Sequence, residues 1–192
     1  MTTINKAVNA KAEANKTVFV DAANAFAATK EQALAKVEQA ETVEDKLSFA
    51  KTAKTAQTHE RYNEALASMS EKALASLNKY KVDADALSKQ ARELKKRSIA
   101  ILEALASNQK VNDRALDAVL QFIVAKDAAS MTLEQVRHEM HHETTTQAQY
   151  FKTCALFFNF ATYSKSDKSV TFNKDAIVLR DLLKIYAIKV EA

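Results

Sequence analysis

The chain has 192 residues and a formal net charge of +4, and it contains neither glycine nor proline. Without glycine it can form no Walker or Rossmann phosphate loop and no glycine-flanked nucleophile elbow, since these motifs depend on glycine's backbone freedom. Glycine and proline are also the usual breakers of helices. Their absence therefore predicts a mainly α-helical protein in which long helices are joined by short polar turns.

The single Cys154 excludes an internal disulfide, and its apolar neighbours predict a buried side chain. No apolar run approaches the roughly 20 residues of a membrane span, and no N-terminal stretch has the apolar core of a signal peptide. We therefore expect a cytoplasmic or nucleoid-associated protein that does not contact a membrane.

The net charge of +4 arises entirely from residues 1–110, because residues 111–192 carry equal numbers of acids and bases. The densest basic stretch lies between Lys79 and Arg97. Such a stretch is either the solvated face of a helix or a surface for nucleic acid or an acidic partner. The candidate residues of this secondary basic patch are Lys89, Arg92, Lys95, Lys96 and Arg97.

The N-terminal half is expected to form a long helical hairpin. A first helix is predicted from about residue 4 to Ala40, with Phe19 and Phe26 on its apolar stripe. Thr42 then stands where its hydroxyl would cap the next helix. The second helix is predicted to continue with little interruption to about Ser107.

A heptad pattern supports that second helix. Large or small apolar residues recur every seven positions. A second set of residues lies four positions after each member of the first. The first set is Leu66, Ala73, Tyr80, Leu87, Leu94 and Ile101. Because the first helix has few large side chains with which to cover this seam, we expect both an antiparallel hairpin and self-association, most simply as a homodimer.

Residues 107–112 are polar and mark the clearest boundary, with Asn112 as the expected N-cap of the following helix. Alanine becomes rarer after this point and aromatic residues more frequent. We therefore expect two domains, a helical hairpin or coiled-coil oligomerisation region at 1–108 and a small domain at 112–192.

The C-terminal part has a recognisable order of elements. Helices are predicted at 114–126, at 132–140 with Thr132 as cap, at 147–158 and at 175–190, and 127–130 is expected to be a turn. Strand character is confined to 160–164 and 169–173, which flank the polar turn 165–168. This succession of helix, short helix, helix, β-hairpin and helix resembles a winged-helix domain.

In that family the third helix enters the DNA major groove and the hairpin forms the wing. The resemblance implies a recognition helix at 144–158 and a wing tip at Lys165 and Lys168. The candidate contacts on the helix are Thr145, Thr146, Gln147, Gln149, Tyr150 and Lys152. Two features depart from a simple DNA-binding module: Asn159 stands where glycine is common, and the segment has no net charge.

Other chemistry is less well supported by the sequence. His138, His141 and His142 could share a helix face, but the threonines that follow predict a break, and one residue is missing from the spacing of a zinc protease. No set of residues supplies a nucleophile, a base and an oxyanion donor together. We therefore expect no enzyme activity, no metal and no cofactor.

The leading interpretation is a non-enzymatic DNA-binding protein, regulatory or architectural, in which a helical oligomerisation region presents a winged helix. A second interpretation is a helical adaptor or inhibitor that binds a protein partner. A structural assembly component is the third, since long alanine-rich helices suit repetitive packing.

Overall fold

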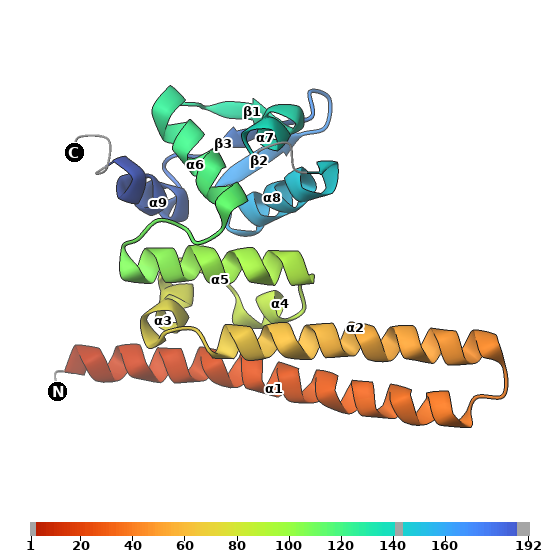
Figure 1. Cartoon of the computed structure of the whole chain (residues 1–192). Helices are drawn as coiled ribbons and strands as arrows, with labels where there is room; N and C mark the ends of the chain where they lie inside the picture. Colours follow the sequence, from red (N-terminus) through yellow and green to blue (C-terminus); the bar gives the residue numbers. More distant parts are fainter. Residues whose placement is uncertain (1–2, 141–143, 188–192) are drawn as a thin grey trace. The chain divides into compact units, whose positions relative to one another are not determined.

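The computed structural model describes residues 3–140 and 144–187. It is mainly helical, with a small three-stranded antiparallel sheet in the C-terminal part (Figure 1), which confirms the expected fold class. Its contacts divide the chain into two compact units. Unit 1 comprises Met1–Leu77 and Asp83–Lys96, and unit 2 comprises Asn78–Val82 and Arg97–Ala192.

The division between the units falls inside helix α5 (Arg92–Ser107) rather than in the polar loop at 107–112. From Arg97 onward, α5 contacts the C-terminal elements, and its side chains at Ile101, Leu102 and Ala104 are buried. The expected domains 1–108 and 112–192 therefore do not coincide with the compact units. The chain begins to pack with the C-terminal elements at Arg97, before its composition changes at 107–112.

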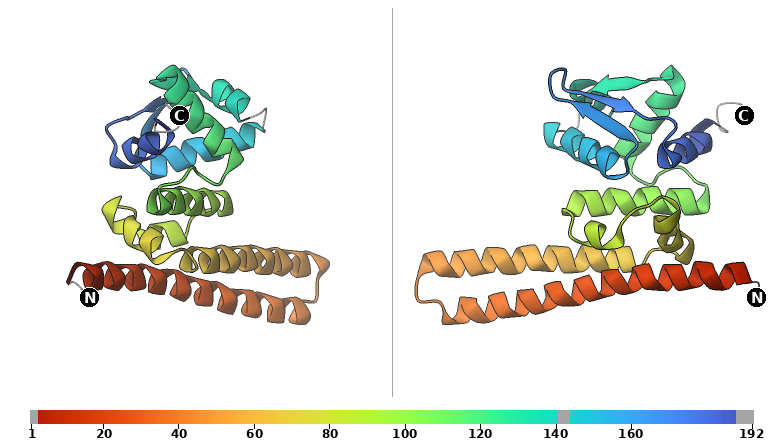
Figure 2. Two further views of the ribbon diagram at one scale, coloured as in Figure 1. Left: turned by 60° about the vertical axis from the view of Figure 1, so that its left-hand side comes forward. Right: turned by 180° about the vertical axis from the view of Figure 1, so that it is seen from behind.

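Unit 1 is built on an antiparallel hairpin of α1 (Thr3–Gln39) and α2 (Val43–Ala67), visible from two sides in Figure 2. The Thr42 hydroxyl accepts a hydrogen bond from the Asp45 backbone N–H at 3.0 Å, which confirms the predicted cap. Most of the buried side chains between these helices are alanine, which lets the helices approach closely. Phe19 and Leu66, each 0% exposed, are the large exceptions.

The prediction of one long second helix is wrong. After α2 the chain forms α3 (Glu71–Lys79), α4 (Ala84–Ser88) and α5. Side-chain caps make these breaks without glycine: the Ser70 hydroxyl accepts from the Ala73 N–H, and the Asp83 carboxylate accepts from Asp85 and Ala86. Lys81, in the turn between α3 and α4, adopts a left-handed φ of 55°.

The heptad positions are nevertheless buried, since none of Leu66, Ala73, Tyr80, Leu87, Leu94 and Ile101 is more than 6% exposed. These side chains are distributed over α2, α3, α4, α5 and the turn after α3 instead of forming the seam of one continuous helix. They are covered within a single chain, so they need no second subunit. The seam therefore gives no reason for a homodimer, and self-association stays a prediction.

Unit 2 carries the sheet. Its elements are α6 (Arg114–Lys126), β1 (Ser130–Thr132), α7 (Leu133–Glu139), α8 (Thr145–Phe157), β2 (Ala161–Ser164), β3 (Ser169–Phe172) and α9 (Ile177–Ala187). The strand order is β1-β3-β2, and Val170 of β3 lies opposite both Met131 and Tyr163. The core is formed by large apolar side chains, among them Leu116, Phe151, Phe160 and Leu179.

Two sequence predictions for unit 2 need correction. Residue 130, expected in a turn, begins strand β1, which at three residues is too short to show an alternating pattern. The N-cap of α6 is Asp113 rather than Asn112, because the Asp113 carboxylate accepts from the Leu116 N–H at 3.0 Å.

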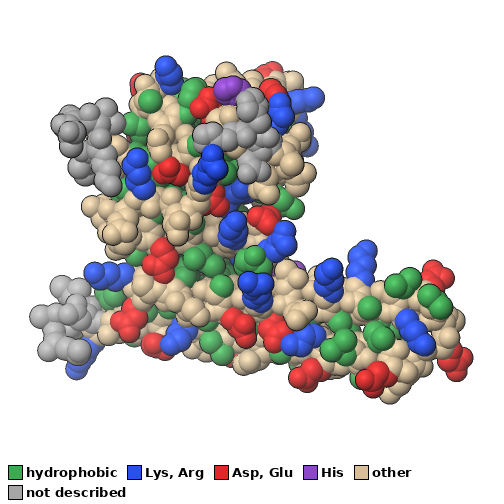
Figure 3. Space-filling model, viewed as in Figure 1, with side chains coloured by type: hydrophobic (Ala, Val, Ile, Leu, Met, Phe, Trp, Pro, Cys, Tyr) green, Lys and Arg blue, Asp and Glu red, His purple; other side chains and the backbone are tan. Residues whose placement is uncertain are grey.

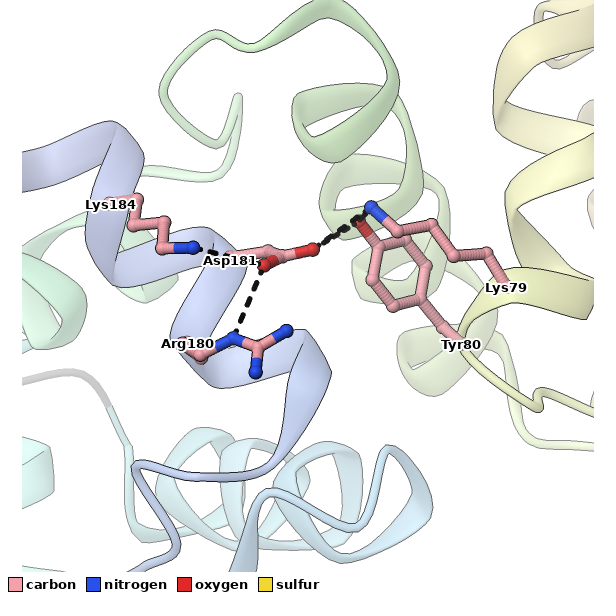
Figure 4. A network of polar contacts seen from close by, with 5 residues as sticks. All are labelled: Lys79, Tyr80, Arg180, Asp181 and Lys184. Carbon is pink, nitrogen blue, oxygen red and sulfur yellow. Dashed lines mark hydrogen bonds and ion pairs between the residues drawn. The ribbon is translucent and has the colours of Figure 1, made fainter.

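A polar network on Asp181 explains why residues 78–82 belong to unit 2 (Figure 4). The Asp181 carboxylate accepts from Lys79 Nζ at 2.9 Å and from the Tyr80 hydroxyl at 3.2 Å, and Arg180 and Lys184 lie 3.6 and 4.0 Å away. Burial alone would raise the pKa of Asp181, but these donors, Lys79 foremost, hold it below its ordinary value. The network fastens the 78–82 segment to α9.

Candidate nucleic-acid interface

Helix α8 forms as the sequence predicts, with Thr144 as its N-cap. The Thr144 hydroxyl accepts from the Gln147 N–H at 3.4 Å, so a free backbone donor in the first turn is satisfied. The buried face of the helix contains Ala148, Phe151, Cys154 and Ala155. This burial fixes which side chains of α8 point away from the core.

The outward face of α8 contains no acidic residue and is polar except near its end, where Leu156 is 40% exposed. Thr145 and Thr146 are exposed in the first turn, and Gln149 and Tyr150 are half-buried one turn later. Lys152 Nζ lies 4.4 Å from the centre of the Tyr163 ring on β2, a distance typical of a cation–π contact. This contact holds the lysine between the helix and the hairpin.

Gln147, also predicted as a DNA contact, has a different position. Its amide oxygen accepts a hydrogen bond from Arg97 Nη2 at 2.7 Å. Arg97 is only 3% exposed, and its Nε lies 4.0 Å from Asp113. Gln147 therefore ties α8 to Arg97 and is not available as a freely exposed base contact.

The β2–β3 hairpin presents the other predicted residues. Asn159, after α8, adopts a left-handed φ of 53°, the conformation for which glycine is usually chosen. At the tip, the Ser164 hydroxyl donates to Asp167 at 3.0 Å, and Lys168 has a φ of 51°. Lys165 and Lys168 are exposed and form no ion pair with any described residue.

The neutral total charge of this region conceals an uneven distribution. Three of the acids away from α8 are engaged by neighbours: Asp117 accepts from Tyr186, Asp127 pairs with Lys174, and Asp181 binds the donors described above. The surface formed by α8 and the hairpin carries Lys152, Lys165 and Lys168 against the single carboxylate of Asp167. We call this the α8–hairpin surface.

The secondary basic patch does not survive as one surface. Lys95 is 0% and Arg97 3% exposed, because each is covered on its own side of α5, Lys95 beside His59 and Phe26 and Arg97 beside Gln147. Lys89 pairs with Asp85 at 2.6 Å, and Arg92 pairs with Glu93 at 2.9 Å. Lys96 is the exposed residue of the patch that has no ion pair with a described residue. Counting charges along the sequence could not reveal which side of the helix is buried.

Lys95 lies in an aromatic environment in unit 1. Its Nζ is 3.2 Å from His59 Nδ1 and 5.6 Å from the centre of the Phe26 ring, on which His59 stacks at 4.6 Å. Burial lowers the pKa of Lys95 to about 8. Burial, and then the charge of Lys95, lower the pKa of His59. No carboxylate of the described residues pairs with this amine, whose contacts are the rings of His59 and Phe26.

Reactive and metal-binding side chains do not cluster in the part of the chain that the structure describes. Among residues 3–140 and 144–187, no group of three or more His, Cys, Asp or Glu side chains is placed to hold a metal ion. His138 is exposed on α7, while His141 and His142 lie outside the described residues. Cys154 is fully buried as predicted, and burial raises the pKa of its thiol to about 12, so it stays protonated at neutral pH.

Comparison with protein-family models, with curated proteins and with solved structures finds no match to this chain. Within the described part of the chain, no helix combines the length and the apolar character needed to cross a membrane. Only the geometry and charge of the molecule itself therefore bear on its function.

Proposed function

We propose that this is a non-enzymatic DNA-binding protein, in which α8 enters the major groove and the β2–β3 hairpin contacts the adjacent backbone. The observation that carries the proposal is the α8–hairpin surface, a helix face free of acids beside a hairpin tip with two lysines that pair with no described residue. The order α6-β1-α7-α8-β2-β3-α9, with β1 paired to β3, also resembles that of a winged helix.

Each group on the surface suits one kind of DNA contact. Lys165 and Lys168 are long, exposed cations that can neutralise phosphates, which supply most of the affinity of such proteins. Thr145, Thr146 and Gln149 carry hydroxyl and amide groups, which can bond to base edges or to phosphates. A location at the nucleoid would accompany this role.

A module with so few cations should bind weakly on its own. If the three lysines each neutralise one phosphate, the logarithm of the binding constant should fall with the logarithm of salt concentration with a slope of about −2.7. Two copies on one duplex would bind much more tightly through their raised effective concentration. A homodimer is therefore part of the proposal.

A titration of duplex DNA at several salt concentrations tests this proposal. Lys152→Glu, Lys165→Glu and Lys168→Glu should each weaken binding, because each replaces a phosphate neutraliser with a repelling charge. Lys126→Glu, an exposed lysine at the end of α6, is the matched control and should have a much smaller effect. Absence of binding by the unmodified chain at about 50 mM salt would refute the proposal.

A protein-binding adaptor is the second candidate, favoured by one observation on unit 1. Three large apolar side chains are strongly exposed there: Leu34 at 50%, Val43 at 75% and Leu47 at 67%. Exposed apolar groups of this kind are typical of contact surfaces for other proteins. If DNA binding fails, a pull-down with the full chain as bait becomes the decisive measurement. The variants Val43→Ser and Leu47→Ser are its negative controls and should capture less of the partner.

A further inference from the structure

Unit 1 contains a hollow of about 450 Å³ on the surface of α2, bordered by α1 and by the start of α5. Four basic and two acidic side chains line it. We call it the Arg61 groove and define it by Lys30, Lys54, Glu60, Arg61, Tyr62 and Arg92. Figure 3 shows Lys and Arg side chains mixed with Asp and Glu side chains along the α1–α2 hairpin. Its volume lies in the range usual for small-molecule sites.

The charges in the groove are only partly compensated. Lys30 pairs with Glu60 at 2.6 Å, and Arg92 pairs with the neighbouring Glu93 at 2.9 Å. Lys54 and Arg61 are exposed, and neither forms an ion pair with any described residue. They stand seven residues apart on α2, which places them two turns from each other on one helix face. The hollow therefore presents two cations that form no ion pair with a described residue, against the one such carboxylate of Glu64.

The nature of these groups narrows the class of ligand. A guanidinium offers a planar fork of donors that matches phosphate oxygens, and an ammonium adds a compact positive charge. The Glu60 carboxylate is occupied by Lys30, and the Thr58 hydroxyl is turned to the backbone oxygen of Lys54. The Thr58 hydroxyl is thus already engaged. Among the lining side chains without an ion pair to a described residue, the two cations Lys54 and Arg61 outnumber the one carboxylate of Glu64, so the excess charge is positive, as an anion site requires.

We propose that the Arg61 groove binds a phosphoryl group, with Lys54 and Arg61 as its principal ligands and Arg92 as a third donor. The Lys30–Glu60 pair sets the edge of the groove, and the half-buried Tyr62 ring forms part of its wall. The phosphoryl group belongs either to a nucleic-acid backbone or to a small free phosphate compound. This site lies on unit 1 and is independent of the α8–hairpin surface on unit 2.

The test uses the full chain and two probes, inorganic pyrophosphate and a short single-stranded DNA, each measured by calorimetry at low salt. The double variant Lys54→Glu/Arg61→Glu should weaken binding by about tenfold or more, because both principal donors become repulsive. The matched control is Lys46→Glu/Lys72→Glu, two exposed lysines of unit 1 outside the groove, which changes the net charge equally. Circular dichroism checks that both variants keep their helices.

The DNA arm is carried out in the Lys152→Glu/Lys165→Glu/Lys168→Glu background, so that failure of the α8–hairpin surface cannot be mistaken for failure of the groove. Pyrophosphate binding that the groove variant loses indicates a free phosphate compound as ligand. DNA binding alone, lost in the same way, indicates a nucleic-acid backbone. Binding of neither probe, equal weakening in the control, or binding of an acidic carboxylate peptide in preference to both probes overturns the proposal.

Discussion

The buried amine of Lys95 should make the protein less stable at neutral pH than it would be with an apolar side chain of similar size. Lys95 is 0% exposed, and burial lowers its pKa from 10.5 to about 8. Each unit of pKa difference corresponds to 1.36 kcal/mol, so the buried charge costs about 3 kcal/mol once the group is fully protonated.

The sign of the pH dependence follows from the direction of this shift. Between about pH 8 and 10.5 the unfolded chain binds a proton at Lys95 that the folded chain releases, so the free energy of unfolding rises with pH across this window. Below about pH 8 the folded state also holds the proton, and the full cost is present. The contacts with Phe26 and His59 offset part of it, by about 1 kcal/mol.

We therefore expect Lys95→Met to raise the free energy of unfolding by about 2 kcal/mol at pH 7. Above pH 10 most of this difference between variant and parent should disappear, because the buried amine of the parent is then neutral. Urea unfolding of variant and parent at a series of pH values measures the difference, in which the titration of all other groups cancels. Lys96→Met is the control, because this neighbouring lysine is exposed. A Lys95→Met protein that is no more stable than Lys96→Met at pH 7 would refute the reasoning.

Two further substitutions test local interactions. Thr42→Ala removes the hydroxyl that accepts from Asp45 and should lower the free energy of unfolding by about 1 kcal/mol, while Thr42→Ser should restore it. Asp181→Asn should cost about 1–2 kcal/mol at pH 7 through the loss of its charge-assisted bond from Lys79. Because the pKa of Asp181 is lowered in the folded state, this difference should shrink as acid protonates the parent carboxylate below about pH 4, and a constant difference down to pH 2 would contradict it.

Features that depend on a few neighbouring residues were predictable from the sequence. The caps at Thr42 and Thr132 form as expected, the latter as a full capping box with Gln135. Asn159 adopts the left-handed conformation proposed for it at the end of α8. Each of these depends on one side chain and the adjacent backbone, so no knowledge of tertiary packing was needed.

The region between Ala67 and Arg92 could not be derived in this way. Seven-residue spacing of apolar side chains is typical of a coiled coil, yet short helices that bury one face on a common surface produce the same spacing. What decided between these structures was the capping by Ser70 and Asp83, whose short polar side chains compete with helix continuation. Neither residue disrupts a heptad pattern strongly enough to be noticed in the sequence.

For the candidate sites too, the sequence shows which charged residues are neighbours along the chain but not which of them are buried or brought together by folding. Charge runs are visible in a sequence, but the inward orientation of Lys95 and Arg97 on α5 depends on which face of the helix is covered. Conversely, Lys54 and Arg61 lie far from the basic run at 79–97 and come together with Arg92 only through folding. The sequence alone therefore overestimated one basic surface and missed the other.

Because the chain has no glycine, residues with a Cβ atom occupy the left-handed backbone positions, including one at the hairpin tip. Five residues among those described adopt a left-handed φ without it: Lys81, Asn108, Asp127, Asn159 and Lys168. A residue with a Cβ atom pays about 1 kcal/mol or more in this conformation, a cost that asparagine and aspartate reduce through local hydrogen bonds but lysine does not. At Lys168 no ion pair with a described residue compensates the strain. Stability thus gives no reason for a lysine at the hairpin tip, whereas the proposed contact with a phosphate backbone would.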